Sequence, residues 1–485
     1  MRKRRGRLPY PPGPRAEPFL GHLRKVPKTY DESAYREMAK KYGEIIYLDI
    51  LGKELVLLNS EKVANDLLDK RSSIYSDRPQ LPFHDMIGWT DTLALLHYGS
   101  NFLKMRKLVQ DQLTRKKCTL FEDIQLHQRR LLIQNLFHSP EKFIAHLKRF
   151  VTAVVLEIAY GRRVVSDDDQ FLINAATIDE LVAASGTTGL VILDFIPILK
   201  YVPSWVPGAW YSQFAQSEIV FPLLQPVKVI LNGLAAARPI VKAIKDYGLT
   251  VVQQDLAAGK AQISFSSMHL EELMRQNRDT KEEVERLNLA AFQLYTAGGE
   301  TTWSAMETFF LAMLIFPDSQ REAQKELDQC VGHGRLPDFG DRENLPYLNC
   351  VVQEVLRWYP VVPLGLPHRV MQDDIYEGMF IPKGTTVIAN VRLMLTNEEI
   401  YHDPFRFIPE RYLPKPEGKG EPLPNTAFGF GRRICPGRWL AESEMWVAIA
   451  SILSVFDIKP IQNAEGVDII PKAEFHDSMT RYIIH

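Results

Sequence analysis

The 485-residue chain is long enough for one large domain or for two or three domains of ordinary size. Its hydrophobic content of 46% can fill a sizeable core, and its formal net charge of −1 excludes the general attraction to nucleic acid that a basic protein shows. The four cysteines are scattered and form no C-x-x-C pair, which argues against a disulfide framework and against a cysteine-rich zinc site. This usage fits a reducing, cytosol-facing environment.

The chain opens with a dense basic run, Met1–Arg7, which the proline-rich stretch Leu8–Pro14 follows. No apolar segment precedes the run, and the longer apolar stretches elsewhere are too short or interrupted to span a bilayer. The run fits a solvated tail or a nuclear address, or a juxtamembrane segment with a stiff proline hinge whose membrane helix is absent from this chain. We assign residues 1–14 to the juxtamembrane interpretation and residues 15–485 to one domain.

Helical periodicity dominates the chain, and the predicted strands are short. Residues 43–59 predict two strands around a turn at Gly52–Lys53, and strands return at 375–391 and 466–484. Helices are predicted at 29–42, 60–70, 101–117, 140–160, 212–245, 282–314, 318–331, 343–358 and 438–456. No alternating βαβ pattern and no G-x-G-x-x-G occurs, so we expect no nicotinamide or flavin domain. The sequence predicts a mainly α fold with small β-sheets in a single large domain.

The stretch 190–209 is apolar, but Asp194, Lys200 and three prolines interrupt it. It cannot form a spanning helix. It is either a buried connection or an exposed loop that dips into a membrane surface.

Two later patterns, A-G-G-E-T-T and E-x-x-R, carry too little information to indicate a function by themselves and depend on the motifs that follow them. Within the helix predicted at 282–314 stands A-G-G-E-T-T, and each mid-helix glycine costs about 1 kcal/mol relative to alanine, so the pair needs an explanation. The pattern E-x-x-R occurs at Glu272/Arg275, Glu283/Arg286 and Glu354/Arg357, where it usually marks a solvated ion pair. Only the third pair precedes W-Y-P-V-V-P and then F-I-P-E-R-Y.

Near the C-terminus, F-G-F-G-R-R-I-C-P-G places Cys435 among glycines and arginines. Zinc would need about three more cysteine or histidine ligands, and none lies nearby. A nucleophilic cysteine, with a histidine from elsewhere, stays open. An axial thiolate to haem iron needs one sulfur and a shaped loop, and a helix start just after Cys435 would stabilise the thiolate. Arg433 could reach a haem propionate.

This loop resembles the haem loop of the cytochrome P-450 family, F-x-x-G-x-R-x-C-x-G. Every fixed place is matched, by Phe428, Gly431, Arg433, Cys435 and Gly437. Five such matches arise by chance on the order of once in ten thousand chains of this length. The resemblance extends from Tyr10 to the C-terminus, and its PPGP, LPDF, PLGLPHR and IPKGT stretches are similar to the membrane-bound fungal members.

The resemblance implies haem b as the cofactor, with Cys435 as the iron ligand and the other loop positions around it. It implies that Ala297 belongs to the helix stretch that opens over the iron. Glu300 and Thr301 match the acid–alcohol pair that relays protons to iron-bound oxygen. Glu354, Arg357 and Arg411 match a buried structural triad.

The resemblance also implies three contacts to the haem propionates, by Arg106, His368 and Arg433. Arg106 fits the family's W-x-x-x-R helix, in which Phe102 replaces the tryptophan and removes one N–H donor. Arg392 stands where a tryptophan is common in the family, and the sequence assigns no consequence to it.

The implied activity is that of a haem-thiolate monooxygenase that inserts one oxygen atom of O₂ into a lipophilic organic substrate, in secondary metabolism or detoxification. The alternatives are a redox-independent isomerase or dehydratase on the same scaffold, which Thr301 argues against, and a non-catalytic haem-binding protein. The substrate pocket is expected around residues 80–98, 183–210, Gln293 and Val361–Leu364, which are mostly apolar.

Electrons must come from a separate protein, because only fifty residues (485 − 435) follow Cys435. The expected donor is an NADPH-dependent flavoprotein reductase, with cytochrome b5 as a second donor, at the cytosolic face of the endoplasmic reticulum membrane. The candidate docking face, or else a solvated basic surface, consists of Lys104, Lys107, Arg115, Lys116, Lys117 and Arg438.

Overall fold

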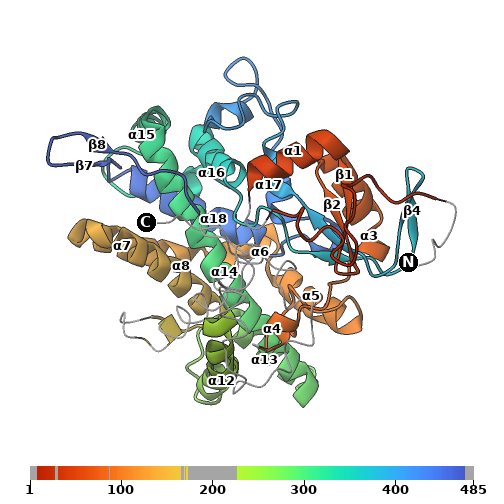
Figure 1. Ribbon diagram of the computed structural model, residues 1–485. Coiled ribbons are helices and arrows are strands. Elements are labelled where there is room, and N and C mark those ends of the chain that lie inside the picture. Colours follow the sequence, from red (N-terminus) through yellow and green to blue (C-terminus); the bar gives the residue numbers. More distant parts are fainter. Residues whose placement is uncertain are drawn as a thin grey trace.

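The computed structural model describes residues 8–27, 31–86, 88–164, 169, 171–172 and 227–475. Within these residues helices form most of the molecule, and the larger sheet lies to one side (Figure 1). The longer helices are α1 (Glu32–Tyr42), α5 (Ser100–Gln112), α7 (Glu122–His138), α8 (Phe143–Tyr160), α12 (Val227–Ala257), α13 (Phe265–Arg275), α14 (Lys281–Ile315), α15 (Pro317–Cys330), α16 (Pro346–Trp358) and α18 (Arg438–Leu453). The mainly α prediction is confirmed.

Shorter helical segments connect these elements. The short α-helices are α2 (Glu61–Ala64), α3 (Ser72–Tyr75), α4 (Pro82–Met86), α6 (Arg115–Cys118) and α17 (Val391–Leu395). A π-helical segment, η1 (Asn65–Lys70), directly continues α2. The 3-10 turns are η2 (Thr119–Phe121), η3 (Pro140–Lys142), η6 (Phe339–Asn344), η7 (Pro409–Tyr412), η8 (Asn425–Phe428) and η9 (Gly431–Arg433).

The strands form one four-stranded and two two-stranded sheets among the described residues. The larger sheet has the order β1 (Ile45–Ile50), β2 (Lys53–Leu58), β6 (Thr386–Ala389) and β3 (His368–Arg369). β2 pairs antiparallel with β1 and parallel with β6, so the N-terminal hairpin and a strand more than three hundred residues later share one sheet. The small sheets pair β4 (Asp374–Tyr376) with β5 (Met379–Ile381) and β7 (Ile461–Gln462) with β8 (Asp468–Ile469).

Most of the predicted elements appear with small shifts. The predicted helix 101–117 is divided into α5 and α6, and the Thr114 hydroxyl accepts from the Lys117 N–H at 3.2 Å to begin the second helix. The predicted 212–245 helix begins outside the described residues, and α12 continues to Ala257. The C-terminal hairpin starts at Ile461 rather than at 466. Helices α7 and α13 were not predicted.

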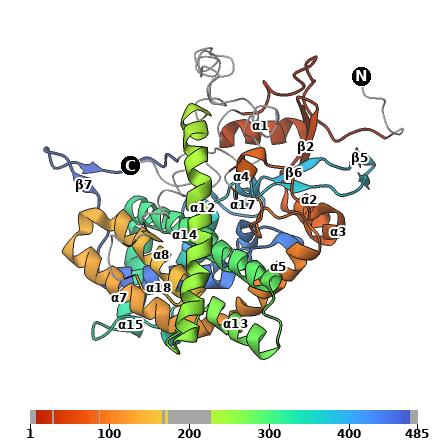
Figure 2. The ribbon, with the colours of Figure 1, turned by 90° about the horizontal axis from the view of Figure 1, so that it is seen from below.

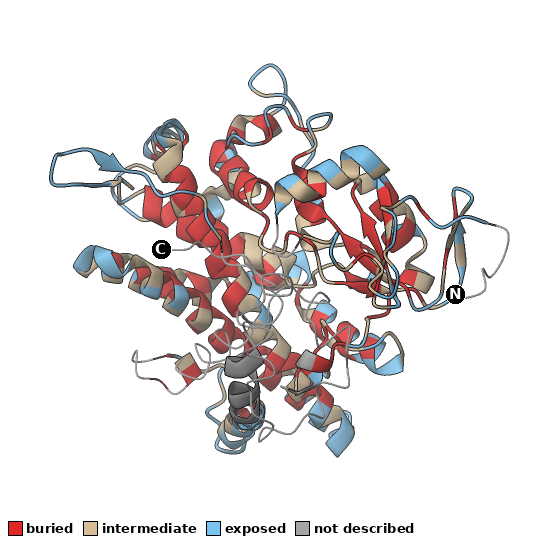
Figure 3. Cartoon of the chain, in the orientation of Figure 1, coloured by how far each residue is buried: buried red, intermediate tan, exposed pale blue. Residues whose placement is uncertain are grey.

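Helix α14 runs through the centre of the molecule, and its buried residues belong to the largest hydrophobic core together with those of α8, α16 and α18 (Figures 1 and 3). Gly298 permits a close approach of α14 to α8: a Cβ atom there would lie 2.6 Å from Cγ1 of Val155. The mid-helix glycine therefore has a packing role. Gly299 has no such contact, because its Cβ atom would meet only Oγ1 of Thr152, at 4.0 Å.

Residues 8–14 pack on the sheet side of the molecule. The carbonyl of Pro9 accepts from the Phe380 N–H at 2.7 Å, and that of Pro12 accepts from the Tyr47 N–H at 2.8 Å. The ring of Tyr10 stacks on Tyr47 with centroids 4.6 Å apart. In the part of the chain that the structure describes, no helix has the length and apolar character needed to cross a bilayer. The 183–210 stretch, with its apolar 190–209 segment, lies outside the described residues.

Candidate active site

Cys435 lies in a tight loop between η9 and the start of α18. Its N–H donates to the carbonyl of Phe428 at 2.8 Å, which closes the loop. Gly429 and Gly431 have φ angles of +80° and +51°, a region that side chains rarely adopt. A Cβ atom on Gly431 would lie 2.2 Å from the carbonyl oxygen of Leu68 in η1, so the loop rests on the π-helical segment only because this residue is glycine.

The Cys435 thiol is half-buried and surrounded by donors. Burial raises its pKa, while the N–H of Gly437 and the guanidinium groups of Arg106 and Arg438 oppose this rise. Burial prevails, so the protein alone favours the thiol. A bound metal ion would supply the positive charge that converts such a thiol into a thiolate.

The other three cysteines have different surroundings. Burial raises the pKa of Cys118 to about 11 and that of Cys350 to about 12. Cys330 is exposed, and its Sγ lies 3.3 Å from the carbonyl of Asn344. None of the three lies in a glycine-rich loop facing arginines, so their surroundings indicate packing rather than chemistry.

Arg433 is the centre of a buried basic cluster. Its Nε donates to the carbonyl of Ser76 at 2.7 Å, and its Nη1 and Nη2 donate to the carbonyls of Leu93 and Leu96 at 3.2 and 2.7 Å. The Phe102 ring lies 3.8 Å below the guanidinium carbon. Burial, with the neighbouring charge of Arg106, lowers the pKa of Arg433 to about 10, although Asp77 acts in the opposite direction.

Arg106 and His368 join this cluster from α5 and β3. Nε of Arg106 donates to Oε1 of Gln110 at 3.3 Å, and its two Nη atoms have no hydrogen-bond partner among the described residues. Nδ1 of His368 lies 2.7 Å from the carbonyl of Tyr75. Burial and the charges of Arg78 and Arg433 lower the pKa of His368, so the imidazole is neutral and donates from Nδ1.

Arg78 is the member of the cluster that the sequence did not reveal. It is fully buried, and it donates to the carbonyls of Ala94, Leu366 and Pro367 at 2.8, 2.9 and 2.7 Å. It thereby joins the segment before α5 to the segment before β3. Burial and the charge of Arg433 lower its pKa.

These four side chains, Arg78, Arg106, His368 and Arg433, are the basic cluster. Asp77 is the acid that acts on the cluster, and it is already ion-paired with Arg369 and lies 3.1 Å from Nδ1 of His97. Buried cations without matching anions are costly, so the arrangement calls for an anionic ligand. A haem carries two carboxylates and an iron, which fit the basic cluster and the Cys435 thiol beside it. Approach of a carboxylate would also raise the pKa of His368 and convert Nε2 into a donor.

The acid–alcohol pair lies on α14, which is continuous through residues 297–302. The Thr301 hydroxyl donates to the carbonyl of Ala297 at 2.8 Å, a bond to the preceding turn. Thr301 is half-buried, and Glu300 is 5% exposed. One helix turn therefore carries a hydroxyl and a buried carboxyl group in succession.

The three E-x-x-R pairs differ sharply in burial. Glu272–Arg275 is solvent-exposed, Glu283–Arg286 is partly buried, and Glu354–Arg357 has 0% exposure at both side chains. Arg357 donates to Glu354 through Nε and Nη2, both at 2.8 Å. The context-based choice of the third pair thus selects the pair that lies in the core.

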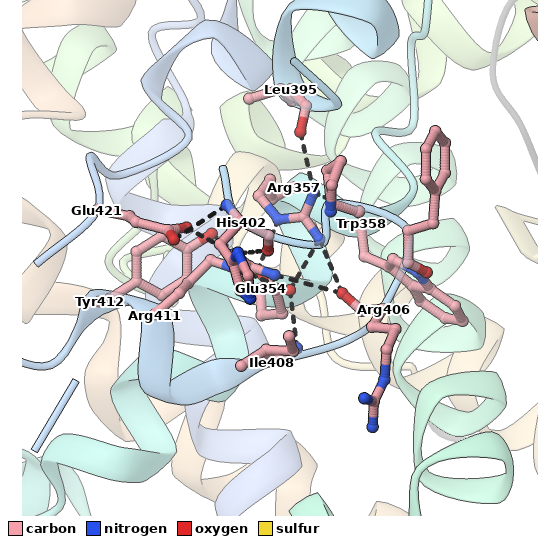
Figure 4. A network of polar contacts seen from close by, with 12 residues as sticks. Glu354, Arg357, Trp358, Leu395, His402, Arg406, Ile408, Arg411, Tyr412 and Glu421 are labelled. Atoms are coloured by element: carbon pink, nitrogen blue, oxygen red, sulfur yellow. Dashed lines mark hydrogen bonds and ion pairs between the residues drawn. The ribbon is translucent and has the colours of Figure 1, made fainter. Parts of the chain in front are cut away.

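Arg411 and Tyr412 complete the network around Glu354 (Figure 4). Nε of Arg411 donates to Glu354 at 3.0 Å, and its Nη1 pairs with Glu421 at 2.6 Å. Arg357 also donates to the carbonyls of Leu395, Pro404 and Arg406, at 2.9, 2.8 and 3.2 Å. The network ties α16 to the segment from Leu395 to Tyr412, which leads into the cysteine loop.

Arg392 has a structural role that its sequence position did not disclose. It is 2% exposed, its Nε pairs with Glu32 at 2.7 Å, and its Nη1 donates to the carbonyl of Trp358. Its guanidinium lies 4.4 Å from the ring centre of Tyr359. The residue thereby joins α17 to α1 and to the end of α16.

The residues of the predicted docking face are divided among three helices, α5, α6 and α18. Lys104 and Lys107 are exposed on α5, and Arg115 and Lys116 are exposed on α6. Trp439, at the start of α18, lies between Arg115 and Arg438, whose guanidinium carbons are 5.7 and 4.8 Å from its ring centre. Trp439 was not among the predicted docking residues, although it stands only four residues after Cys435 in the sequence.

The segments expected to line a pocket belong to two different hydrophobic cores. The Ala94 N–H donates to Oε1 of Gln293 at 3.1 Å, which joins the 80–98 segment to α14. Trp89 packs edge-on against Phe292 with centroids 6.4 Å apart. Leu364 instead belongs to the small core between α1 and the larger sheet.

A thiol in a rigid glycine-shaped loop beside a buried basic cluster defines a haem-thiolate protein. A comparison with protein families matches residues 11–480 to the family Cytochrome P-450. The chain belongs to this family and is a cytochrome P-450 monooxygenase, which carries a haem-thiolate cofactor.

Curated relatives cover nearly all of the chain. Cytochrome P-450 monooxygenase 208 of Postia placenta is 38% identical over 94% of this chain and 85% of its own length. Cytochrome P-450 monooxygenase COX2 of Coprinopsis cinerea is 38% identical over 96% of this chain and 86% of its own length. Cytochrome P-450 monooxygenase ple1 of Rhodocybe pseudopiperita is 36% identical over 97% and 87%.

Proposed function

We propose that this monooxygenase inserts one oxygen atom of O₂ into a lipophilic organic substrate, by hydroxylation or a related oxidation, in secondary metabolism or detoxification. The observation that carries the proposal is the acid–alcohol pair on α14, with the Thr301 hydroxyl donating to Ala297 at 2.8 Å and Glu300 buried beside it in sequence. The apolar character of Trp89, Phe292 and Val361 supports a lipophilic substrate.

When bound, the haem supplies the activation of O₂, and the protein supplies ligation, orientation and protons. Cys435 would ligate the iron, within the loop that also holds Phe428, Gly431 and Gly437. Arg106 and His368 would hold the propionates, together with Arg78, which the structure adds to the set. Arg433 would be a further propionate partner: like Arg78, it already donates three hydrogen bonds to backbone carbonyls, so both would act through their remaining N–H groups.

Proton delivery requires the Thr301 hydroxyl to change partners. Its proton is now donated to the Ala297 carbonyl, so rotation about χ1 or replacement of that bond would release it toward the substrate side. Glu300 would then replace the proton. A redox-independent isomerase would need neither group.

Thr301→Ala tests this proposal, with Thr308→Ala as the matched control. Both hydroxyls lie on α14 and donate to the carbonyl four residues earlier, at 2.8 Å for Thr301 and 3.3 Å for Thr308. We expect Thr301→Ala to keep its haem but to form less product per NADPH and more hydrogen peroxide, whereas Thr308→Ala stays coupled. Equal coupling in both variants would reassign Thr301 to helix packing.

We further propose that a separate NADPH-dependent flavoprotein reductase docks on the basic face around Trp439, with cytochrome b5 as a second donor. Long-range attraction to an acidic partner would be screened by salt. Reversing Lys104, Lys107 and Lys116 to glutamate together should slow reduction by the reductase and leave peroxide-driven turnover normal. An unchanged rate with unchanged salt dependence would make the face an ordinary solvated surface.

The membrane context is part of the same proposal. We place the protein at the cytosolic face of the endoplasmic reticulum membrane, with residues 1–14 as a basic juxtamembrane segment and residues 15–485 as the haem domain. The basic run Met1–Arg7 supports this placement, because an anionic leaflet attracts such segments.

A further inference from the structure

A surface groove lies between Pro14 and Lys25 on one side and helix α1 on the other. Figure 2 shows α1 toward one edge of the molecule. Its volume is about 420 Å³, within the roughly 300–1,000 Å³ typical of small-molecule pockets. The lining residues are Pro14, Lys25, Ala34, Glu37, Met38, Lys40, Lys41 and Tyr42. Apolar walls thus alternate with three lysines and one glutamate.

One wall of the groove is held rigidly by His22, which is 3% exposed. Its Nδ1 accepts from the Asp49 N–H at 2.7 Å, so Nε2 carries the proton and donates to the carbonyl of Pro14 at 2.7 Å. The Lys25 N–H donates to the His22 carbonyl at 2.8 Å. Two of the lining residues are therefore fixed to the edge of the larger sheet, and the groove is preformed.

The charge of the groove is positive and only partly compensated. Lys40 pairs with Glu37 at 3.0 Å, with both side chains largely exposed. Lys25 and Lys41 have no ion-pair partner among the residues that the structure describes, and Nζ of Lys41 lies 5.5 Å from the ring centre of Tyr42. Two free ammonium groups beside apolar carbon suit a ligand that is anionic at one end and apolar at the other.

The same segment exposes an aromatic ring in a strained turn. Phe19 is 98% exposed, and its φ of +63° is a genuine outlier for a bulky residue. Glu17 and Gly21 hold the turn by exchanging backbone hydrogen bonds at 2.7 and 2.9 Å, and Arg24 pairs with Glu17 at 2.6 Å. The turn therefore holds the phenylalanine ring in water, where it is available to enter an apolar surface.

We propose that this groove binds the headgroup of an anionic phospholipid in a bilayer, while Phe19 inserts among the acyl chains. The charge complementarity of Lys25 and Lys41 selects an anionic headgroup, and the exposed ring selects a bilayer over a free phosphate. This inference rests on the proposed membrane association and adds a lipid preference and a defined site to it.

The test measures cosedimentation of the full-length holoprotein with vesicles of phosphatidylcholine alone or with phosphatidylserine added. The variant Lys25→Gln/Lys41→Gln is compared with Lys260→Gln/Lys281→Gln, which removes the same charge from two exposed lysines. Lys260 precedes α13, which lies at the opposite end of the molecule from α1 in Figure 2. Both variants keep the basic run Met1–Arg7, so its contribution cancels.

We expect the groove variant to bind phosphatidylserine vesicles roughly 25-fold more weakly, because each of the two lysines near an anionic leaflet favours binding about fivefold. The control should change less than about twofold. Phe19→Ser should weaken binding to both kinds of vesicle. Equal losses in the two lysine variants, or no loss in either, would overturn the proposal.

Two further outcomes separate the possible failures. If the unmodified protein binds no vesicle, the membrane association itself is wrong. If soluble glycerophosphoserine competes for the groove while Phe19→Ser binds vesicles normally, the ligand is a free anion rather than a bilayer lipid, and the inference fails while the membrane association survives.

Discussion

The protein contains two buried groups of charged side chains that are built in opposite ways. Around Glu354, two guanidinium groups, a phenol and a backbone N–H share one carboxylate, and Glu421 adds a second acid. In the basic cluster, Asp77 acts on Arg78 and Arg433, and its carboxylate is already paired with Arg369. The first group is complete, whereas the described residues provide no carboxylate that bonds to the second.

The pKa directions express the same difference. Burial acts to lower the pKa of Arg357, but the bonded Glu354 reverses this, and the pKa is raised. Burial lowers the pKa of Arg433 to about 10, and the neighbouring Arg106 adds to the decrease. A network in which every cation has its carboxylate holds the fold together. A cluster of cations without a carboxylate instead favours binding of an anionic ligand.

The largest expected effect comes from Cys435, whose thiol lies beside the incomplete cluster. Cys435→Ser should abolish the thiolate-type absorption of the reduced carbon monoxide complex. Replacement of Cys118, Cys330 or Cys350 by serine should leave the band intact, because none of them adjoins the cluster. A normal band in Cys435→Ser would remove the central assignment.

Glu354→Gln should break the complete network and leave Arg357 in the core without a counter-charge, while Arg411 keeps its pair with Glu421. We expect the free energy of unfolding to fall by about 3–5 kcal/mol, measured by urea denaturation of the holoprotein. Glu272→Gln, which breaks an exposed pair of the same spacing, should cost less than about 1 kcal/mol. Similar costs for the two variants would contradict the distinction drawn between them.

Arg78→Gln probes the incomplete cluster, because it removes a cation rather than an anion. A charge-assisted hydrogen bond contributes about 1.5–3 kcal/mol, so transfer of haem to an apoprotein acceptor should quicken roughly tenfold or more. Arg129→Gln is the control, since Arg129 is also a buried arginine that donates to a carbonyl, that of Pro337. Equal haem loss in both variants would reduce Arg78 to a packing residue.

Phe102→Trp should have the smallest effect. The indole would restore an N–H donor worth about 1 kcal/mol, while an aromatic face still supports Arg433, so haem loss should slow by up to about fivefold. The measurement is again haem transfer to an apoprotein acceptor. Faster loss in this variant would count against the placement of α5 as the family's tryptophan-bearing helix.

The elements that the sequence predicted are those whose apolar residues follow the helical period. Helix α7 was missed because its buried face includes Gln125, Gln128 and Arg129. These side chains bond to groups on other helices, such as Ser443 and Glu157, so their burial leaves no apolar stripe in the sequence. The parallel pairing of β2 with β6 was equally invisible, because it joins residues that lie far apart in the chain.

At the site, the same limit separates Cys435 from Arg78. The cysteine loop could be identified because its chemistry and its glycines are local. Arg78 acts on carbonyls 16 and 289 residues away, and only folding brings it to Arg433. The role of Arg392 as a partner of Glu32 likewise depends on two segments 360 residues apart.

The contact between Gly298 and Val155 has a mechanical consequence. Because a methyl group at Gly298 would meet Cγ1 of Val155, α14 and α8 can slide or separate only by losing this close packing. Another neighbour of α14, helix α12, makes a contact of a different kind: Lys245 of α12 lies 5.3 Å from the Phe292 ring and donates to the Gly88 carbonyl at 3.0 Å. A lysine side chain can change rotamer and still keep such contacts, so we infer that separating α14 from α12 costs less than separating it from α8.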